Sequence, residues 1–205
     1  MSDSPRPALS RERIAATALE LIDANGLTGL SMRKLGAELG VEAMSLYHYI
    51  TNKNDLLDAV ADHLYGEIEL PVSIDPQDWE TAIRLGLRSF HDVLLEHEAA
   101  LELFASRQIR SERSVQVLHW AHERFVAVGL SVEEAHKALH MGVSFVMGHA
   151  VNETGTGSVR PANAVDVSAE MDAYFRHIES VTSDELFDAG LDLVVAGLRQ
   201  RYRLS

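Results

Sequence analysis

The sequence predicts an all-α fold, with a small helical domain over residues 1–66 and a larger helical domain over residues 67–205. Apolar residues recur at helical spacing along most of the chain, and no run alternates with period two for long enough to require a sheet. Apolar residues make up 46% of the 205 residues, so the chain can bury a sizeable core. Capping residues and glycines mark where the helices begin and end.

Two helices near the N-terminus each begin at a serine and end before a glycine. The first runs from the Ser10 cap to about Asn25, before Gly26, and the second covers Met32–Leu39 between Ser31 and Gly40. A serine hydroxyl accepts from a free N–H of the first turn, and glycine tolerates the left-handed conformation that ends many helices. The first helix is predicted to bury Ile14, Ala18, Leu21 and Ile22.

Two further helices complete this region. A short one is expected from about Glu42 to Ile50, and after a turn over residues 52–54 a fourth should start near Asp55. The buried face of the fourth helix is predicted to contain Leu56, Leu57, Val60 and Leu64.

The larger domain is predicted to follow a linker over residues 70–75. Asp75-Pro76 indicates a helix start, because a capping side chain precedes a proline in the first turn, and this helix should reach about Glu96. Two later helices begin at capping-box spacings, Ser131 with Glu134 and Thr182 with Glu185, and should reach about Glu153 and Tyr202. The remaining expected elements are a shorter helix to about Arg107, a helix over 111–128 stopped by Gly129, a mobile loop over 154–163 and a helix near Val165.

The segment Ser31–Ile50 has the layout of a helix-turn-helix, in which the second helix enters the major groove of DNA. On a wheel of 100° per residue, Leu46 and Ile50 point inward, while Met44 and His48 point outward. Ser45 and Tyr47 lie on the two flanks of this outer face, where a surface helix would usually carry lysine or glutamate. Such side chains suit contacts with groove edges, thymine methyl groups and phosphates. A plain helical bundle with exposed aromatic residues is the alternative.

Family resemblance supports the DNA-binding interpretation. The run LSMRKLGAELGVEAMSLYHYITNKNDLLDAV closely resembles the DNA-binding region of the tetracycline-repressor (TetR) family. The resemblance rests on Leu35, Leu39, Gly40, Val41, Leu46, Tyr47, Tyr49, Asn52-Lys53 and Leu56-Leu57. The segments DWETAIRLGLRSFHDVLLEH, GVSFVMGHAVNE and ELFDAGLDLVVAGLRQRY are similar to the C-terminal domain of the tetracycline-type branch.

This resemblance implies a homodimer that binds double-stranded operator DNA of near-palindromic sequence and responds to a small-molecule effector. The candidate DNA-binding residues are Ser31, Arg33, Lys34, Ala43, Met44, Ser45, Tyr47, His48, Tyr49 and Lys53. Ala43 departs from the tetracycline-type pattern, which has a long polar side chain there to read a base. We therefore expect a different operator sequence.

The effector site is expected in the larger domain. Leu103 and Ser144 stand where the resemblance would place the histidines that hold a drug–magnesium complex, so we expect neither that metal site nor any other cofactor. Candidate lining residues are Phe90, Phe104, Arg107, Trp120, Phe125, Met141, Ser144, Phe145 and Met147, although apolar residues at helical spacing are more often plain core. The histidine pairs His119/His122 and His136/His140 share helix faces, but a metal site needs further ligands.

Composition excludes several other classes of protein. The net charge of −13 argues against a nucleic-acid binder, but residues 1–55 hold six basic and seven acidic residues, so the acidity lies in the larger domain. There is no cysteine, signal-peptide run or apolar stretch of membrane-spanning length, which fits a cytoplasmic protein. We find no HExxH, GxSxG, P-loop or GxGxxG motif, so an enzyme is not expected. A helical ligand-binding or scaffold protein without DNA binding stays as the alternative.

Overall fold

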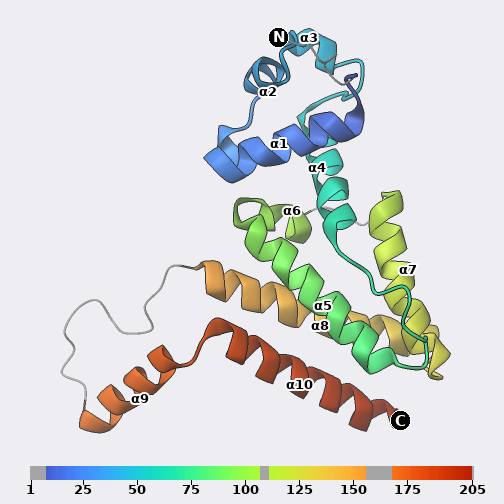
Figure 1. The fold of residues 1–205 in the computed structure, drawn as a ribbon, viewed down its shortest axis with the longest axis vertical. Helices are drawn as coiled ribbons and strands as arrows, with labels where there is room; N and C mark the ends of the chain where they lie inside the picture. Colours follow the sequence, from blue (N-terminus) through green and yellow to red (C-terminus); the bar gives the residue numbers. More distant parts are fainter. Residues whose placement is uncertain (1–7, 107–110, 156–167, 205) are drawn as a thin grey trace, which may run out of the picture. The chain divides into compact units, whose positions relative to one another are not determined.

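The computed structural model describes residues 8–106, 111–155 and 168–204, and every regular element in these ranges is helical (Figure 1). The chain forms two compact units. The first combines Met1–Leu70 with Asp92–Trp120, and the second combines Pro71–His91 with Ala121–Ser205. The domain boundary predicted after residue 66 stays a prediction.

The first helix, α1 (Arg11–Asn25), has the predicted ends. The Ser10 hydroxyl accepts from the Arg13 N–H at 3.2 Å, and Gly26 follows with a φ of 71°. Its buried face was predicted with one error, because Leu21 is half-buried and the buried positions include Ala15 and Leu19. The buried face therefore lies slightly further round the helix than the apolar spacing indicated.

The helix-turn-helix is formed by α2 (Met32–Leu39) and α3 (Ala43–Leu46). Ser31 caps α2, and Gly40 has the left-handed conformation, with a φ of 70° and a ψ of 31°. Gly36 allows the turn to approach α2, since a Cβ at this position would lie 2.9 Å from the Val41 carbonyl oxygen. The third helix was predicted too long: α-helix ends at Leu46, after which the chain continues as a turn.

The fourth helix, α4 (Lys53–Glu67), starts two residues earlier than predicted. The Asn52 side chain accepts from the Asp55 N–H at 3.0 Å, so Asn52 is the N-cap rather than part of a longer turn. The four apolar residues expected on its inner face are all buried, namely Leu56, Leu57, Val60 and Leu64. Within this unit α1 packs against both α2 and α4.

The rest of the first unit comes from residues 92–120. The short helix η2 (Glu98–Ala100) packs against α1, and α6 (Leu101–Ser106) packs against α4. The buried His97 lies between two carboxylates, with Nδ1 2.8 Å from Asp23 Oδ2 and Nε2 2.8 Å from Glu67 Oε2. Burial lowers the pKa of His97, but the hydrogen bonds and charges of the two carboxylates outweigh burial and raise it.

The helix expected to begin at Asp75-Pro76 instead begins at Trp79, as α5 (Trp79–Glu96). The Asp75 carboxylate accepts from the Gln77 N–H at 2.9 Å and forms a turn. Asp78 then takes the capping position, because its side chain accepts from the Thr81 N–H at 3.3 Å. The chain continues into α7 (Glu112–Ala127), which ends before Gly129 with its φ of 96°.

The second unit is completed by α8 (Val132–Thr154), α9 (Ala169–Ser180) and α10 (Ser183–Tyr202). Both predicted capping boxes are present, at the starts of α8 and α10. The predicted loop over 154–163 and the helix start near Val165 lie largely outside the described residues. No helix in the described ranges is long and apolar enough to cross a bilayer.

Helices α8 and α10 pack against each other (Figure 1). Gly190 permits close approach, since a Cβ there would clash with the Phe145 ring. Two arginines of α5 form ion pairs with α10, Arg84 with Asp192 and Arg88 with both Asp184 and Asp188. Three helices of the second unit are thus joined by apolar packing and by ion pairs.

Candidate nucleic-acid interface

Residues 43–50, here called the α3 segment, comprise α3 and the turn that follows it, and two apolar side chains anchor them from behind. Leu46 and Ile50 are both 0% exposed, as the helical wheel predicts. On the opposite side Met44 is 71% exposed and Tyr47 is 44% exposed, and His48 is also exposed. Burial of the two anchors therefore keeps the outer side chains in solvent, where another molecule can reach them.

The backbone after α3 stays tightly wound although the α-helix has ended. The Tyr47 N–H donates to the Met44 carbonyl at 3.2 Å, and the Tyr49 N–H donates to the Leu46 carbonyl at 2.9 Å. Such i to i+3 bonds give three residues per turn and place side chains differently from an α-helix. Tyr49 is exposed as a result, together with Tyr47 and His48.

An ion pair holds the end of this segment to the helices beneath it. Arg11 of α1 pairs with the Asp55 carboxylate and also donates to the Tyr49 carbonyl oxygen at 3.1 Å. Asp55 Oδ2 accepts from the Thr51 N–H at 2.7 Å and from the Thr51 hydroxyl at 3.0 Å. The hydrogen bond from Arg11 is the main reason that the pKa of Asp55 is lowered to about 2. This pair was not predicted from the sequence, because its members lie 44 positions apart.

The basic candidates differ in what they contact. The Lys34 ammonium donates to the Gly29 carbonyl at 3.0 Å, and the Lys53 ammonium donates to the Leu30 carbonyl at 3.3 Å. An ammonium has three donors, so each lysine keeps donors for a phosphate. Arg33 is exposed on α2, so its guanidinium is accessible to another molecule.

The smaller candidates are partly used by the fold itself. The Ser31 hydroxyl accepts from the Lys34 N–H at 3.3 Å and is therefore the cap of α2. Ala43 is half-buried, and its backbone lies against Gly36, where an added Cβ would be 3.1 Å from the Ala43 nitrogen. Ser45 is half-buried on the flank of α3. Gly36 was not among the residues predicted to matter for this segment. The sequence signal for its close contact with the turn is that it is the first of the two glycines in MRKLGAELG.

The candidate effector residues divide between the two units. In the first unit Trp120 is buried, and Phe104 contacts Tyr65 edge-on with ring centroids 5.1 Å apart. In the second unit Phe125 lies against Trp79, with ring centroids 6.0 Å apart. Phe90 of the same unit is also buried, and Phe145 and Met147 are half-buried. Met141 and Ser144 are exposed on α8. Arg107 lies outside the described residues. Their role in effector binding stays a prediction.

The histidine pairs taken from the sequence differ from the cluster that the fold assembles. The rings of His136 and His140 stack on α8 with centroids 6.3 Å apart. The cluster that forms instead joins His91 with His149 and Glu153. The spacing of the last two, one helical turn apart, was visible in the sequence, but the approach of His91 across 58 residues was not.

Comparisons with known proteins agree with this architecture. Residues 14–60 match the model of the bacterial regulatory proteins of the tetR family, and residues 72–202 match the tetracyclin repressor-like C-terminal domain. The HTH-type transcriptional repressor DrrR1 of Streptomyces coeruleorubidus is 32% identical over 149 residues, which is 73% of this chain and 55% of DrrR1. The match thus spans about half the length of DrrR1.

Two solved structures show the likeness of the fold. ActR of Streptomyces coelicolor in complex with actinorhodin aligns with a TM-score of 0.77 at 27% identity, covering 95% of this chain and 98% of ActR. BioQ with its double-stranded DNA operator aligns with a TM-score of 0.66 at 26% identity, covering 94% and 99%. The two family models together cover both the helix-turn-helix and the larger helical region, and the chain belongs to the tetR family of bacterial transcriptional regulators.

Proposed function

We propose that this chain is a homodimeric transcriptional repressor that binds a near-palindromic operator and is released from it by a small molecule. The observation that carries the proposal is the orientation of the α3 segment. Leu46 and Ile50 are buried, whereas Met44, Tyr47 and His48 are exposed. An exposed helix face of methionine, tyrosine and histidine suits contact with groove edges, thymine methyl groups and phosphates.

Each outer side chain suits a different part of the duplex. Met44 and Ala43 can contact thymine methyl groups, while Ser45 and His48 can bond to base edges or phosphates. Tyr47 and Tyr49 each combine an apolar ring with a hydroxyl that can reach a phosphate. Arg33, Lys34 and Lys53 supply positive charge beside this face and would fix its position on the backbone.

The dimer is proposed to form through α8 and α10, which each have an apolar face exposed on the single chain. On α10 the stripe contains Leu186, Ala189, Leu193, Ala196 and Gly197, with Leu193 76% exposed. Leu191, Val195 and Leu198 point the other way and are buried within the chain's own core.

Helix α8 carries a comparable stripe of Met141, Ser144, Gly148 and Val151. A Cβ added at Gly148 or Gly197 would meet no atom within 4 Å, so a second chain can approach both helices closely. A twofold dimer through these faces would present two α3 segments, as a palindromic operator requires.

The release by a small molecule is proposed from the family and from ActR, whose structure contains actinorhodin. An effector need only bind more tightly to a conformation that binds DNA poorly. Linkage then requires that operator DNA weaken effector binding by the same factor by which the effector weakens DNA binding. We further infer that the protein acts by binding rather than by catalysis, in the cytoplasm beside the DNA that it binds.

The test begins by selecting bound fragments from random double-stranded DNA with the full chain. Tyr47→Ala should weaken binding to the selected operator at least about 10-fold, since each good DNA contact contributes about 1–3 kcal/mol and the dimer loses it twice. Tyr174→Ala, at an exposed tyrosine of α9, is the matched control and should bind normally. Affinity should also fall as salt rises.

Two outcomes would contradict the proposal. Unchanged operator binding by Tyr47→Ala would mean that the α3 face is not the reading surface. The absence of any saturable binding at low salt would favour the alternative, a helical ligand-binding or scaffold protein without DNA binding.

A further inference from the structure

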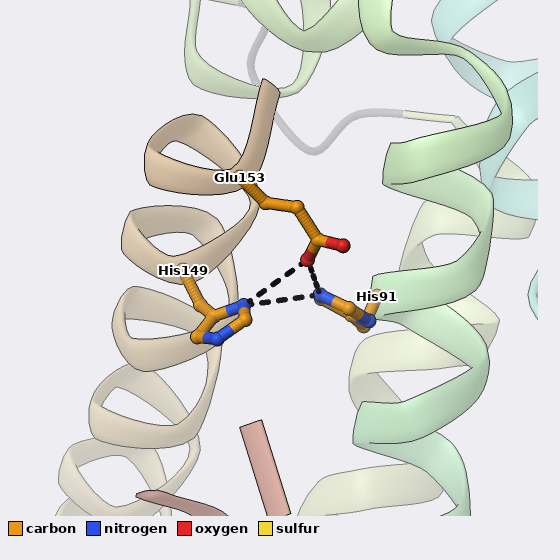
Figure 2. A group of neighbouring side chains, drawn as sticks. All are labelled: His91, His149 and Glu153. Atoms are coloured by element: carbon orange, nitrogen blue, oxygen red, sulfur yellow. Dashed lines mark hydrogen bonds and ion pairs between the residues drawn. The ribbon is translucent and has the colours of Figure 1, made fainter. Parts of the chain in front are cut away.

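Three side chains of the second unit converge on one point between α5 and α8. His91 comes from α5, while His149 and Glu153 lie one turn apart on the same face of α8 (Figure 2). His91 Nε2 lies 3.2 Å from His149 Nδ1 and 3.3 Å from Glu153 Oε2, and the remaining distance, from His149 Nδ1 to Glu153 Oε2, is 3.5 Å. The three atoms thus form a nearly equilateral triangle.

This triangle has the size of one face of a tetrahedral metal site. With ligand atoms about 2.0–2.1 Å from a zinc ion, the edges of the tetrahedron are about 3.3–3.4 Å long. The observed edges of 3.2, 3.3 and 3.5 Å match that length. A single proton can form a good hydrogen bond between only two of the three atoms, whereas one cation could be coordinated by all three.

The surroundings hold the two imidazoles in these orientations. His91 is 1% exposed and stacks on the Phe187 ring of α10 with centroids 4.0 Å apart. His149 meets the same ring edge-on, with centroids 5.2 Å apart. An apolar wall around ligands excludes water and strengthens their interaction with a cation.

The local charge also permits a cation. Arg88 lies over the Phe187 ring, with its Cζ 4.3 Å from the centroid, and would repel a metal ion if it stood alone. Its guanidinium is paired with Asp184 and Asp188, which offset that charge. Glu153 then contributes one negative charge to the site itself.

We propose that this chain binds one divalent transition-metal ion of the zinc type through His91 Nε2, His149 Nδ1 and Glu153 Oε2. Two imidazoles and one carboxylate are a known zinc ligand set, and imidazole nitrogen favours zinc, copper or nickel over magnesium or calcium. Three protein ligands leave the fourth position for water or a small ligand. The site goes beyond the proposed function, because nothing in operator binding requires it.

The test measures metal binding directly on the full chain, freed of metal by a chelator. Zn²⁺ affinity is measured by competition with a chromophoric chelator, and Co²⁺ serves as a spectroscopic probe of tetrahedral coordination. We expect one tightly bound equivalent per chain and a tetrahedral Co²⁺ spectrum. Glu153→Gln should weaken Zn²⁺ binding by about 100-fold or more, since even losing a residue that only orients a ligand costs about 10–100-fold.

The controls separate loss of a ligand from general damage. Glu153 lies at an exposed position, so Glu153→Gln should keep the wild-type circular dichroism, and His149→Gln gives a second ligand variant. The double variant His136→Gln/His140→Gln removes a surface histidine pair from the same helix and should keep the tight equivalent.

Zn²⁺ binding unchanged in both ligand variants would overturn the proposal, as would loss of the tight equivalent in the His136/His140 variant alone. No DNA is used in this test, so failure of the repressor proposal would not affect its result.

Discussion

The ion pair between Arg11 and Asp55 should stabilise the end of the α3 segment, and Asp55→Asn tests this directly. Arg11 joins α1 to the Tyr49 carbonyl, and Asp55 joins α4 to the backbone of Thr51. Asparagine has nearly the shape of aspartate but no charge. The substitution therefore removes the charge pairing without leaving a cavity.

The size of the effect follows from the pKa of Asp55. A fall from 3.8 to about 2 corresponds to about 2.5 kcal/mol of preference for the charged carboxylate in the folded state. The Arg11 side chain is 42% exposed, so water screens the pair, and exposed pairs contribute only about 0.2–1 kcal/mol. We expect Asp55→Asn to lower the free energy of unfolding by about 1 kcal/mol at pH 7.

The pH dependence has a definite sign. Because the folded-state pKa of Asp55 is lowered, the stabilisation is fully present above the unfolded value near 3.8 and is lost as pH falls toward 2. At pH 3 about half of it should be gone. The stability gap between wild type and Asp55→Asn should thus be constant from pH 5 to 7 and smaller at pH 3.

Urea unfolding of the full chain between pH 3 and 7 measures this gap. Glu38→Gln is the matched control, since it removes one negative charge from an exposed position on α2. Operator binding should also weaken more in Asp55→Asn than in Glu38→Gln, because the end of the α3 segment loosens. Equal stability of the two variants at pH 7, or a gap that persists unchanged at pH 3, would refute this reasoning.

Three further predictions concern packing, a second titrating group and the dimer. Gly36→Ala should lower the free energy of unfolding by about 1–3 kcal/mol in urea, since its Cβ would lie 2.9 Å from the Val41 carbonyl oxygen, and wild-type stability would contradict this. His97→Gln should cost about 2 kcal/mol at pH 6 and less at pH 9. Because folding raises the pKa of His97, its stabilisation is fully present below the unfolded-state pKa of 6.5 and is lost as pH rises through the folded-state pKa. A stability difference between wild type and His97→Gln that does not shrink at pH 9 would exclude an ion pair between charged His97 and the two carboxylates. Leu193→Glu should yield monomers in sedimentation, whereas Leu85→Glu, an exposed leucine of α5, should keep the dimer; a dimer in both would place the interface elsewhere.

Helix starts were predictable where one side chain decides them. Ser10, Ser31 and the two capping boxes each use a hydroxyl to accept from an N–H three residues later, and the required spacing is written in the sequence. The start of α5 was not predictable, because Asp75 and Asp78 are both good caps. Burial of Trp79, which is 1% exposed, accompanies the later start, and such burial cannot be read from a cap pattern.

The outward orientation of the exposed face of residues 43–50 was predictable because it depends on a local period. Once Leu46 and Ile50 are inward, the residues between them must point outward. The contacts that hold this face, and the His91 cluster, were not predictable, since they join residues 44 and 58 positions apart. Periodicity shows which side of a helix is buried, but it does not show what the helix is packed against.

The net charge of −13 remains compatible with DNA binding because of where the carboxylates are used. In the first unit Asp55 is neutralised by Arg11, and Asp23 and Glu67 both bond to His97. Each of these carboxylates contributes to holding helices together rather than adding an isolated negative charge. A phosphate approaching α3 would therefore meet less repulsion than the count of acidic residues indicates, and local pairing decides this more than the total charge does.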